Sequence, residues 1–491
     1  MVSRAGFGRV ASLRRSAFSA LLAGSISMVL AACAVGPDYE RPEAPNADEF
    51  VTPSTLAVDS ADVERDFWKT FDDALLTELI EEALRANHDV RIAFSRLSEA
   101  RALRGEARFD VAPTVTAAAG ATDARTSIRQ NPFPNVDRDQ DYYEAGFDAF
   151  WELDFFGRVR RGLQAQSALV GAAEAELYAT QVTVTAEVAR NYFELRGAQQ
   201  RLEVAQRNAT NQEESLRITR ARLDGGRGTQ LDVSRAQSLL SATRATIPDL
   251  EAAVTYAMLR LGVLTGNSPE ALMPRLAEAR PLPALPATHR IGTPESLLRR
   301  RPDIQVAERQ LAAATARIGV AVADLFPRIS FVGRWGFDAA SSADLGDASS
   351  EAFAFGPSIQ WAAFDMGRVR QRIHQREAAA QGALARYEQR VLQALEETDA
   401  SLTSYAQALA KQQHLRQSAA SSAEAATIAR ARFESGVSDF LTVLDAERTM
   451  LEAEDRLAAS ETQTATALLS MYKALGGGFR PVEGASLRAA R

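Results

Sequence analysis

Residues 432–447 read RFESGVSDFLTVLDAE and lie between two long segments with the sequence pattern of α-helices. Gly436 is expected to end the first helix in a left-handed conformation, and Ser438 or Asp439 is expected to cap the next helix. An earlier stretch, residues 222–236, repeats this arrangement at an offset of 210. Both stretches are therefore predicted to be the sharp tips of helical hairpins.

The bulk composition narrows the class of protein. The chain has 491 residues, a net charge of −7, 7% aromatic residues and one cysteine. It contains no run of eighteen apolar residues, so no transmembrane helix is expected and any membrane crossing would have to consist of strands. The acidic balance, without a basic stripe, argues against a nucleic-acid partner.

The N-terminus has the pattern of a secretory signal: several arginines, a short apolar stretch, and Leu-Ala-Ala before Cys33. The signal is expected to comprise residues 1–32 and to be removed. This sequence resembles a bacterial lipoprotein box, which implies diacylglycerol and palmitate on Cys33. A chance buried thiol is the alternative. Ala34, in place of the aspartate that retains many such lipoproteins in the inner membrane, points to the outer membrane. Residues 33–66 are rich in proline and acidic residues and are predicted to form an extended tether.

Most of the remaining chain reads as two copies of one unit. Asp89 and Pro113 recur 214 residues later, in helical patterns at residues 73–109 and 294–326, whereas the stretch 157–160 recurs 210 residues later. The four-residue difference is expected in the strand-to-strand loop of the first copy. The period is too long for a solenoid. The expected parts are a first structural repeat, a linker, a second structural repeat and a C-terminal tail, at residues 67–275, 276–293, 294–476 and 477–491.

Each half contains two stretches in which apolar and polar residues alternate. In the first half a weak stretch begins at Thr114 and a clear one covers residues 144–153, and in the second half they cover residues 329–338 and 353–363. Segments of about ten residues with apolar and polar faces are typical of a transmembrane barrel. A half-buried strand in a soluble sandwich would show the same alternation.

The number of strands bears on the assembly. Membrane barrels need at least about eight strands to close, so a single chain with four strands cannot form one. Two copies would just reach this minimum without room for a wide lumen. Three copies would supply twelve strands, so a homotrimer is the preferred closed ring.

A very long helical pattern follows each strand pair, at residues 157–224 and 367–435. At about 1.5 Å per residue, such a helix spans about 100 Å, several times the hydrocarbon thickness of a bilayer. Its thin apolar stripe favours coiled-coil contacts with neighbouring helices over a thick core. Each long helix is expected to return through its tip by a shorter helix. Pairing Leu261-Gly262 with Leu475-Gly476 would bring the offset back to 214 at the end of that helix.

No catalytic set is present in the sequence. The four histidines, His88, His289, His374 and His414, are too scattered for a metal site. His374 with Glu377 is the kind of pair that a charged helix holds routinely, and no Walker or Rossmann glycine pattern occurs. The chain is therefore expected not to be an enzyme and to need neither a metal nor a cofactor beyond the lipid on Cys33.

Three motifs resemble those of the outer-membrane factor family, the TolC/OprM-like trimeric tunnels of Gram-negative efflux systems. They are VGPDYERP at residues 35–42, RRPDI at 300–304 and SGVSDFLTVLDAE at 435–447. The first two are similar to the lipoprotein branch that serves resistance-nodulation-division (RND) pumps. The resemblance implies a mixed α/β membrane protein. Its trimeric twelve-stranded transmembrane β-barrel would be continuous with a long periplasmic α-helical barrel.

The same resemblance implies a function and partners. The protein would be the outer-membrane channel of a tripartite efflux system, a passive exit duct for drugs or other small toxic compounds. Its hairpin tips would meet a periplasmic adaptor that bridges to an inner-membrane pump, which supplies the energy. The candidate adaptor-contacting residues at the tips are Gly225, Gly226, Gly436, Val437, Ser438 and Asp439.

The resemblance also implies a periplasmic gate near the second tip. Two acidic positions of the family correspond here to Thr442 and Asp445, of which only Asp445 is acidic. A ring of three Asp445 carboxylates would repel one another and favour bound cations, and the alternative is a solvated tip residue. Asp232 is explained by its capping-box spacing from Thr229. Asp445 lies beyond the reach of capping, so it is expected to lack a local structural partner.

Other functions remain alternatives at this point. A non-conducting coiled-coil envelope tether would need no alternating ten-residue segments. The same duct could serve type I secretion or metal export, although no methionine or histidine cluster supports export of metal ions.

Overall fold

The computed structural model describes residues 34–43, 49–51, 56–59, 61, 64–127, 129 and 138–479. The predicted signal and Cys33 lie outside these residues. The chain divides into two compact units. The strand unit comprises Met1–Pro42, Leu97–Ala172 and Ala307–Tyr387, and the hairpin unit comprises Glu43–Arg96, Ala173–Val306 and Glu388–Arg491.

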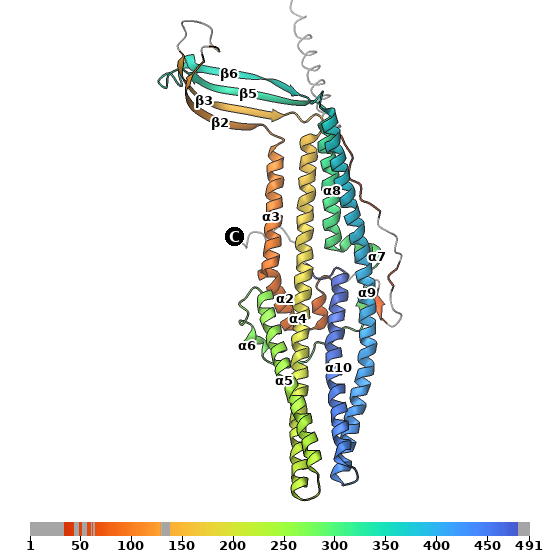
Figure 1. The fold of residues 1–491 in the computed structure, drawn as a ribbon. Helices are drawn as coiled ribbons and strands as arrows, with labels where there is room; N and C mark the ends of the chain where they lie inside the picture. The colour runs from red at the N-terminus through yellow and green to blue at the C-terminus, as the bar shows by residue number, and fades with distance from the viewer. Residues whose placement is uncertain are drawn as a thin grey trace, which may run out of the picture. The chain divides into compact units, whose positions relative to one another are not determined.

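The strand unit contains, within the described residues, a four-stranded antiparallel sheet in the order β2-β3-β5-β6 (Figure 1). The strands are β2 (Thr114–Arg125), β3 (Asp139–Glu152), β5 (Arg328–Ala339) and β6 (Glu351–Gln360). The strands expected from the alternating sequence are thus present. Strands β3 and β5 join the two halves of the chain, and β2 and β6 are the edges of the sheet.

The alternation of side chains gives the sheet two different faces. One row of neighbours across the strands consists of Ala117, Phe147, Trp335 and Phe353. The rings of Phe147 and Trp335 stack with their centres 6.2 Å apart. On the opposite face Arg334 forms ion pairs with Glu144 and Asp338. The apolar face is largely exposed in the single chain, as the 70% exposure of Phe353 shows.

The helices before each strand pair are broken where the sequence predicted continuous ones. Residues 73–109 form α2 (Ala74–Ala86) and α3 (His88–Phe109), and residues 294–326 contain α7 (Pro294–Arg300) and α8 (Pro302–Ala323). Asn87 adopts a non-helical conformation and Arg301 an extended one. The break at Arg301 follows from the next residue, Pro302, which disfavours a helical conformation before it.

Two long helices and two returning helices form the hairpins. The long helices are α4 (Arg158–Asp224) and α9 (Met366–Glu434), and the returning helices are α5 (Gln230–Leu264) and α10 (Phe440–Ala474). Both returning helices have 35 residues, with bounds 210 apart at both ends. The predicted return of the offset to 214 is therefore wrong. The glycines that follow these helices, with φ of 77° and 72°, are Gly266 and Gly476.

Short elements connect these parts and complete the core of the hairpin unit. In the hairpin unit the short helices are η1 (Phe67–Phe71) and α6 (Met273–Leu276). In the strand unit, η2 (Ala348–Ser350) precedes β6. Strand β1 (Val58–Asp59) in the predicted tether pairs with β4 (His289–Arg290) in the predicted linker. Trp68 of η1 is fully buried, and Phe67 stacks on Tyr472 with ring centres 4.9 Å apart.

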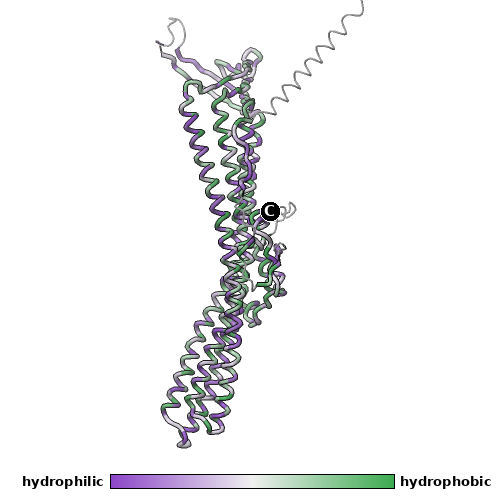
Figure 2. Tube along the Cα trace, turned by 90° about the vertical axis from the view of Figure 1, so that its right-hand side faces the viewer, coloured by the Kyte–Doolittle hydropathy of each residue, from purple (hydrophilic) through white to green (hydrophobic). Residues whose placement is uncertain are grey.

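Within the described part of the chain, no helix combines enough length with enough apolar character to cross a membrane. Figure 2 shows hydrophilic and hydrophobic residues mixed along the long helices.

Candidate functional site

The hairpin tips are built by glycines in the left-handed region. Gly226 has a φ of 71° and Gly436 a φ of 76°. In each tip the amide of the residue after this glycine closes the end of the helix. Arg227 N donates to Arg222 O at 2.8 Å, and Val437 N donates to Arg432 O at 2.9 Å. This is the Schellman arrangement that a glycine after a helix supports, so both turns take the expected form.

The helices that leave the tips have side-chain caps. Thr229 and Asp232 form the predicted capping box. In the second tip Asp439, not Ser438, is the cap, because its carboxylate accepts hydrogen bonds from the amide and the hydroxyl of Thr442. These hydrogen bonds lower the pKa of Asp439.

The two tips share one hydrophobic core in the hairpin unit. The first hairpin contributes Leu216, Val233 and Leu240, and the second contributes Phe433, Phe440, Val443 and Leu444. The guanidinium of Arg222 lies 3.7 Å from the centre of the Phe433 ring and donates to the Phe433 carbonyl at 3.0 Å. Apolar packing and this cation–π contact therefore join the tips within one chain.

Glu447, the last residue of the stretch 432–447, is a buried carboxylate that the sequence interpretation missed. Its Oε1 accepts a hydrogen bond from Ser215 at 2.9 Å and forms an ion pair with Arg430 at 2.7 Å. A usable signal was its spacing of seven residues from Phe440, which places both on one face of α10. Glu447 therefore links three helices, α4, α9 and α10.

The predicted gate residues Thr442 and Asp445 lie on the same groove between α9 and α10. The groove has a volume of about 780 Å³ and is also lined by Ser418, Ser421 and Ser422. The side chain of Asp445 is 66% exposed and forms an ion pair of 2.8 Å with Arg448. The expectation that Asp445 lacks a local partner is therefore wrong, because an arginine one turn further along α10 reaches it.

The candidate contact residues at the tips surround exposed apolar side chains. Val437 is 68% exposed, and the corresponding residues Leu231 and Leu441 of the two tips are also exposed. Gly225, unlike Gly226, does not have a positive φ. Sequence interpretation missed the two leucines, although their equivalent positions just after the caps are a visible signal.

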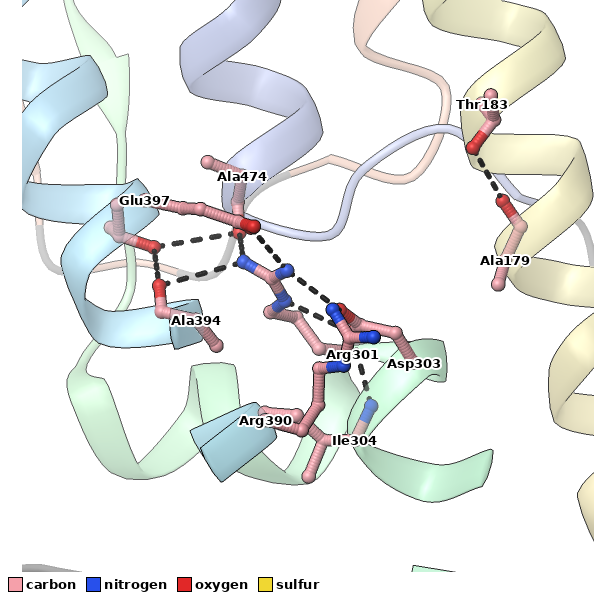
Figure 3. Close-up of polar contacts among 10 residues, drawn as sticks. Ala179, Thr183, Arg301, Asp303, Ile304, Arg390, Ala394, Glu397 and Ala474 are labelled. Carbon is pink, nitrogen blue, oxygen red and sulfur yellow. Dashed lines mark hydrogen bonds and ion pairs between the residues drawn. The ribbon is translucent and has the colours of Figure 1, made fainter. Parts of the chain in front are cut away.

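The RRPDI motif fixes the end of α10 through Arg301, whose side chain is 7% exposed (Figure 3). Arg301 pairs with Asp303 at 2.7 Å and Glu397 at 2.6 Å, and donates to the carbonyl of Ala474 at 3.0 Å. Burial alone would raise the pKa of Asp303, but the hydrogen bonds and the charge of Arg301 outweigh it and lower that pKa. The last carbonyl of α10 thus accepts a hydrogen bond from a buried cation.

The first half of the chain has a neutral version of this contact. Asn87, which lies 214 residues before Arg301, donates from its side chain to the carbonyl of Leu264 at 2.9 Å. Leu264 ends α5, as Ala474 ends α10. In both halves, the residue at the helix break therefore closes the end of the returning helix.

The VGPDYERP motif forms a strap on α4 and α8 in the strand unit, defined here as residues 34–42. Arg161, 4% exposed in its side chain, donates to the carbonyls of Ala34, Val35 and Gly36 and pairs with Asp38 at 2.7 Å. A Cβ added to Gly36 would lie 2.5 Å from the Cα of Gly319. The segment that follows Cys33 is thus held by backbone contacts that a larger residue would block.

The far end of the strap is held by a buried carboxylate on α8. Tyr39 donates to Glu308 at 3.2 Å, and Arg41 forms an ion pair with the same carboxylate at 3.6 Å. Burial and the neighbouring Glu308 raise the pKa of Tyr39. Glu308 therefore anchors two side chains of the motif.

The histidines are not assembled into a site. His374 contacts Glu377 at 3.1 Å on the exposed surface of α9, and His289 is buried against Tyr405 and Tyr472. Among the described residues, no group of three or more histidine, cysteine or acidic side chains could hold a metal ion.

The sheet with one apolar face and the paired long hairpins are the architecture of outer-membrane efflux channels. The structure of the outer-membrane channel OprN has a TM-score of 0.85 and 43% identity, and the match covers 91% of this chain and 99% of that chain. The open-state structure of the Neisseria gonorrhoeae MtrE outer membrane channel has a TM-score of 0.78 and 28% identity, covering 91% and 99%.

The chain belongs to the outer membrane efflux protein family, whose model matches residues 79–267 and 293–477. Similar relatives include outer membrane protein OprJ of Pseudomonas aeruginosa, 34% identical over 97% of this chain and 98% of OprJ. The solvent efflux pump outer membrane protein SrpC of Pseudomonas putida is 30% identical over 92% of this chain and 97% of SrpC. The protein is thus an outer-membrane component of an efflux system.

Proposed function

We propose that this protein is the passive exit duct of a tripartite, RND-type efflux system for drugs or other small toxic compounds. The observation that carries the proposal is the sheet, with an apolar face around Phe147 and Trp335 and a polar face around Arg334. A sheet that crosses a membrane needs one face for lipid and one for the aqueous lumen. The role is transport without catalysis, with energy supplied by the pump.

Closure of the lumen requires more than one copy of the chain. Each chain contributes the four strands β2, β3, β5 and β6, so a homotrimer would form a barrel of twelve strands. The hairpins of three chains would form a periplasmic helical barrel. Residues 67–275 and 294–476 would be the two structural repeats of each chain, each with two strands and a long hairpin, joined by the linker 276–293 and followed by the tail 477–491.

Cys33 is proposed to carry the diacylglycerol and palmitate that anchor the chain to outer-membrane lipid. The support is the strap, which begins at the next residue and is held by Arg161 and Glu308. A segment fixed so close to the cysteine would also fix the place of the acyl chains.

The periplasmic gate is proposed to contain Asp445 and Thr442, and the periplasmic adaptor is proposed to bind the tips. Asp445 is exposed on the groove where Thr442 also lies. Leu231, Val437 and Leu441 present apolar side chains at the tips, which is the kind of surface that partner helices cover. Gly225, Gly226, Gly436, Ser438 and Asp439 surround them.

Single-channel recording in planar bilayers tests both the duct and the gate. The purified protein is expected to conduct, and Asp445→Ala is expected to raise the conductance and weaken block by divalent cations. Glu434→Ala changes an exposed acid at the same tip and serves as the matched control. A protein that never conducts would instead be a tether. Conductance and block that do not change with Asp445→Ala would remove Asp445 from the gate.

A further inference from the structure

The end of the sheet from which α4 and α9 begin carries a tryptophan in each half of the chain. Trp151 lies on the apolar face of β3, and Trp361 follows 210 residues later, directly after β6. The indole N–H of Trp151 donates to the carbonyl of Val111 at 3.0 Å, and that of Trp361 donates to the carbonyl of Leu325 at 3.0 Å. Both rings are nevertheless exposed. Exposed tryptophans with a fixed polar edge are typical of the level at which a membrane-crossing sheet leaves the lipid.

The two connections from the sheet to the long helices differ at one informative position. In the first half, Arg160 of α4 forms an ion pair with Asp154 at 3.3 Å. The residues 210 positions later are Arg370 of α9 and Phe364. A phenylalanine thus replaces the acidic partner, and its side chain is fully exposed. Arg370 is exposed as well and has no side-chain hydrogen bond or ion pair among the residues that the structure describes.

Arg370 lies on the side of α9 that continues the apolar face of the sheet. In the first half, Arg158 donates to Glu152 at 2.7 Å, and Glu152 lies on the polar face of β3. Arg160 is two residues further along α4, which turns it about 200° around the helix from Arg158. Arg368 and Arg370 are the counterparts of these two arginines on α9. Arg370 therefore points away from the polar face.

The charge of Arg370 is not cancelled by the carboxylates of the same helix start. Asp365 forms an ion pair with Arg368 at 3.1 Å, and Glu377, further along α9, contacts His374 at 3.1 Å. The first turn of α9 contains no acidic residue. The N-terminus of a helix adds a partial positive charge of its own. An anion that approaches Arg370 therefore meets a cation without an internal competitor.

The apolar strip of β6 leads directly to this arginine. Phe353, Phe355 and Ile359 lie on one face of β6, and all three are exposed. Trp361 and Phe364 extend the strip beyond the end of the strand, where a turn is closed by a backbone hydrogen bond between residues 365 and 362. Single exposed apolar residues are common, but a continuous strip of them marks a surface that another apolar phase covers.

We propose that Trp361, Phe364 and Arg370, called here the rim patch, bind the headgroup region of an anionic phospholipid. The two rings contact the upper part of the acyl chains, and the guanidinium of Arg370 donates to a phosphate oxygen. The occupant is a lipid because the apolar strip ends at the patch, as acyl chains end at a headgroup. It is an anionic lipid because the patch presents a cation and no carboxylate for an ammonium group. The inference rests on the proposed function in that the apolar face of the sheet meets lipid.

Quenching of tryptophan fluorescence by brominated lipids tests the rim patch. The protein is reconstituted into phosphatidylcholine vesicles that contain a minor fraction of either brominated phosphatidylglycerol or brominated phosphatidylcholine. The difference between the native chain and Trp361→Phe isolates the signal of Trp361. Phosphatidylglycerol is expected to be enriched about fivefold around Trp361, which is the effect of one arginine near an anionic lipid.

The variants of α9 separate the patch from the general charge of the helix. Arg370→Gln is expected to abolish the preference for phosphatidylglycerol, and Arg370→Lys is expected to retain most of it. Arg368→Gln is the matched control, because it removes the same charge two residues away on the other side of α9, and it is expected to keep the preference. High salt is expected to weaken the preference of the native chain.

Each outcome decides one point. Equal quenching of Trp361 by the two lipids would overturn the inference and leave the proposed duct intact. An equal loss of preference in Arg368→Gln and Arg370→Gln would overturn it as well, because net charge would then attract the lipid without the patch. Protein that conducts ions while neither lipid quenches Trp361 would place the edge of the membrane elsewhere on the sheet and overturn the inference alone. Protein that neither conducts nor shows quenching of Trp361 would overturn both proposals.

Discussion

Gly436 adopts a left-handed backbone conformation that is unfavourable for residues with a Cβ. Replacing it with alanine puts an L-residue in the left-handed region at a cost of about 1–2 kcal/mol. Gly436→Ala is therefore expected to speed amide exchange at Gly436 and Val437 about tenfold, as measured by hydrogen–deuterium exchange. The matched control is Gly225→Ala in the first tip, since Gly225 lacks a positive φ and its counterpart is Ser435. Equal effects of both variants would contradict this explanation.

Arg301 illustrates the difference between a buried and an exposed ion pair. Arg301→Ala leaves the end of α10 without its cation and Asp303 with only Arg390 at 4.0 Å, and it is expected to lower the free energy of unfolding by about 3 kcal/mol. Arg299→Ala removes an exposed ion pair with Glu295 and is expected to change the free energy of unfolding by less than about 0.5 kcal/mol. Denaturant unfolding of both variants is the measurement, and a similar loss in each would refute the assignment.

His289, in the predicted linker, makes the stability of the folded protein depend on pH. Its ring is 3% exposed and lies edge-on to Tyr405 at 5.0 Å, and burial lowers its pKa. A lowered pKa in the folded state means that the unfolded chain binds the proton more readily. The stability from neutral His289 is thus complete above about pH 6.5 and is lost as the pH falls below that value.

His289→Phe is therefore expected to reduce the drop in Tm between pH 8 and pH 5, because phenylalanine keeps the ring packing and does not titrate. His414→Gln alters an exposed histidine of α9 and is expected to leave the drop unchanged. A variant His289→Phe with the full pH dependence would show that the titration lies elsewhere.

At the residue scale, sequence interpretation succeeded where local chemistry decides. The tip glycines and the Thr229–Asp232 box follow from backbone geometry and were predictable. The partner of Asp445 was also within reach, since Arg448 is one turn away, but attention to capping alone missed it. Glu447 and Arg301 depend on helices that meet in space, which a single sequence does not reveal.

The strap is the element whose attachment depends most on one side chain. Arg161→Ala removes the donors to three strap carbonyls, so amide exchange at Val35, which donates to the carbonyl of Phe156 at 3.1 Å, is expected to become at least tenfold faster. Arg368→Ala, which breaks an exposed pair with Asp365, is the control. Exchange at Val35 that stays slow in Arg161→Ala would show that Glu308 and Gly319 suffice to hold the strap.

At the element scale, periodicity predicted the strands and long helices well because each has a strong repeating pattern. The breaks at Asn87 and Arg301 were missed because apolar spacing continues across them, although Pro302 was a visible signal for the second break. The false offset arose because Leu261-Gly262, one turn before the end of α5, has the same sequence as Leu475-Gly476, which follows the end of α10. The weak pattern around residues 58 and 289 gave no hint of the β1–β4 pairing.

The whole molecule can be tested through the two faces of its sheet. Phe355→Lys places a charge on the apolar face, at a cost of about 2–4 kcal/mol if that face meets lipid, and is expected to reduce the amount of folded protein in the outer membrane. Ser358→Lys places the same charge on the opposite face of β6 and is expected to be tolerated. The measurement is the yield of heat-modifiable protein in outer-membrane fractions. Equal yields would contradict the assignment of the faces.

The order β2-β3-β5-β6 also has a consequence for how the chain folds. The β2–β3 and β5–β6 hairpins close short loops, whereas the central β3–β5 contact joins residues such as Glu144 and Arg334, 190 positions apart. Closing the longer loop costs about 2 kcal/mol more in chain entropy, so the hairpins are expected to form first. Until they meet, β3 and β5 expose unpaired edges that favour aggregation. The folding intermediate is therefore expected to need protection from aggregation more than the finished protein does.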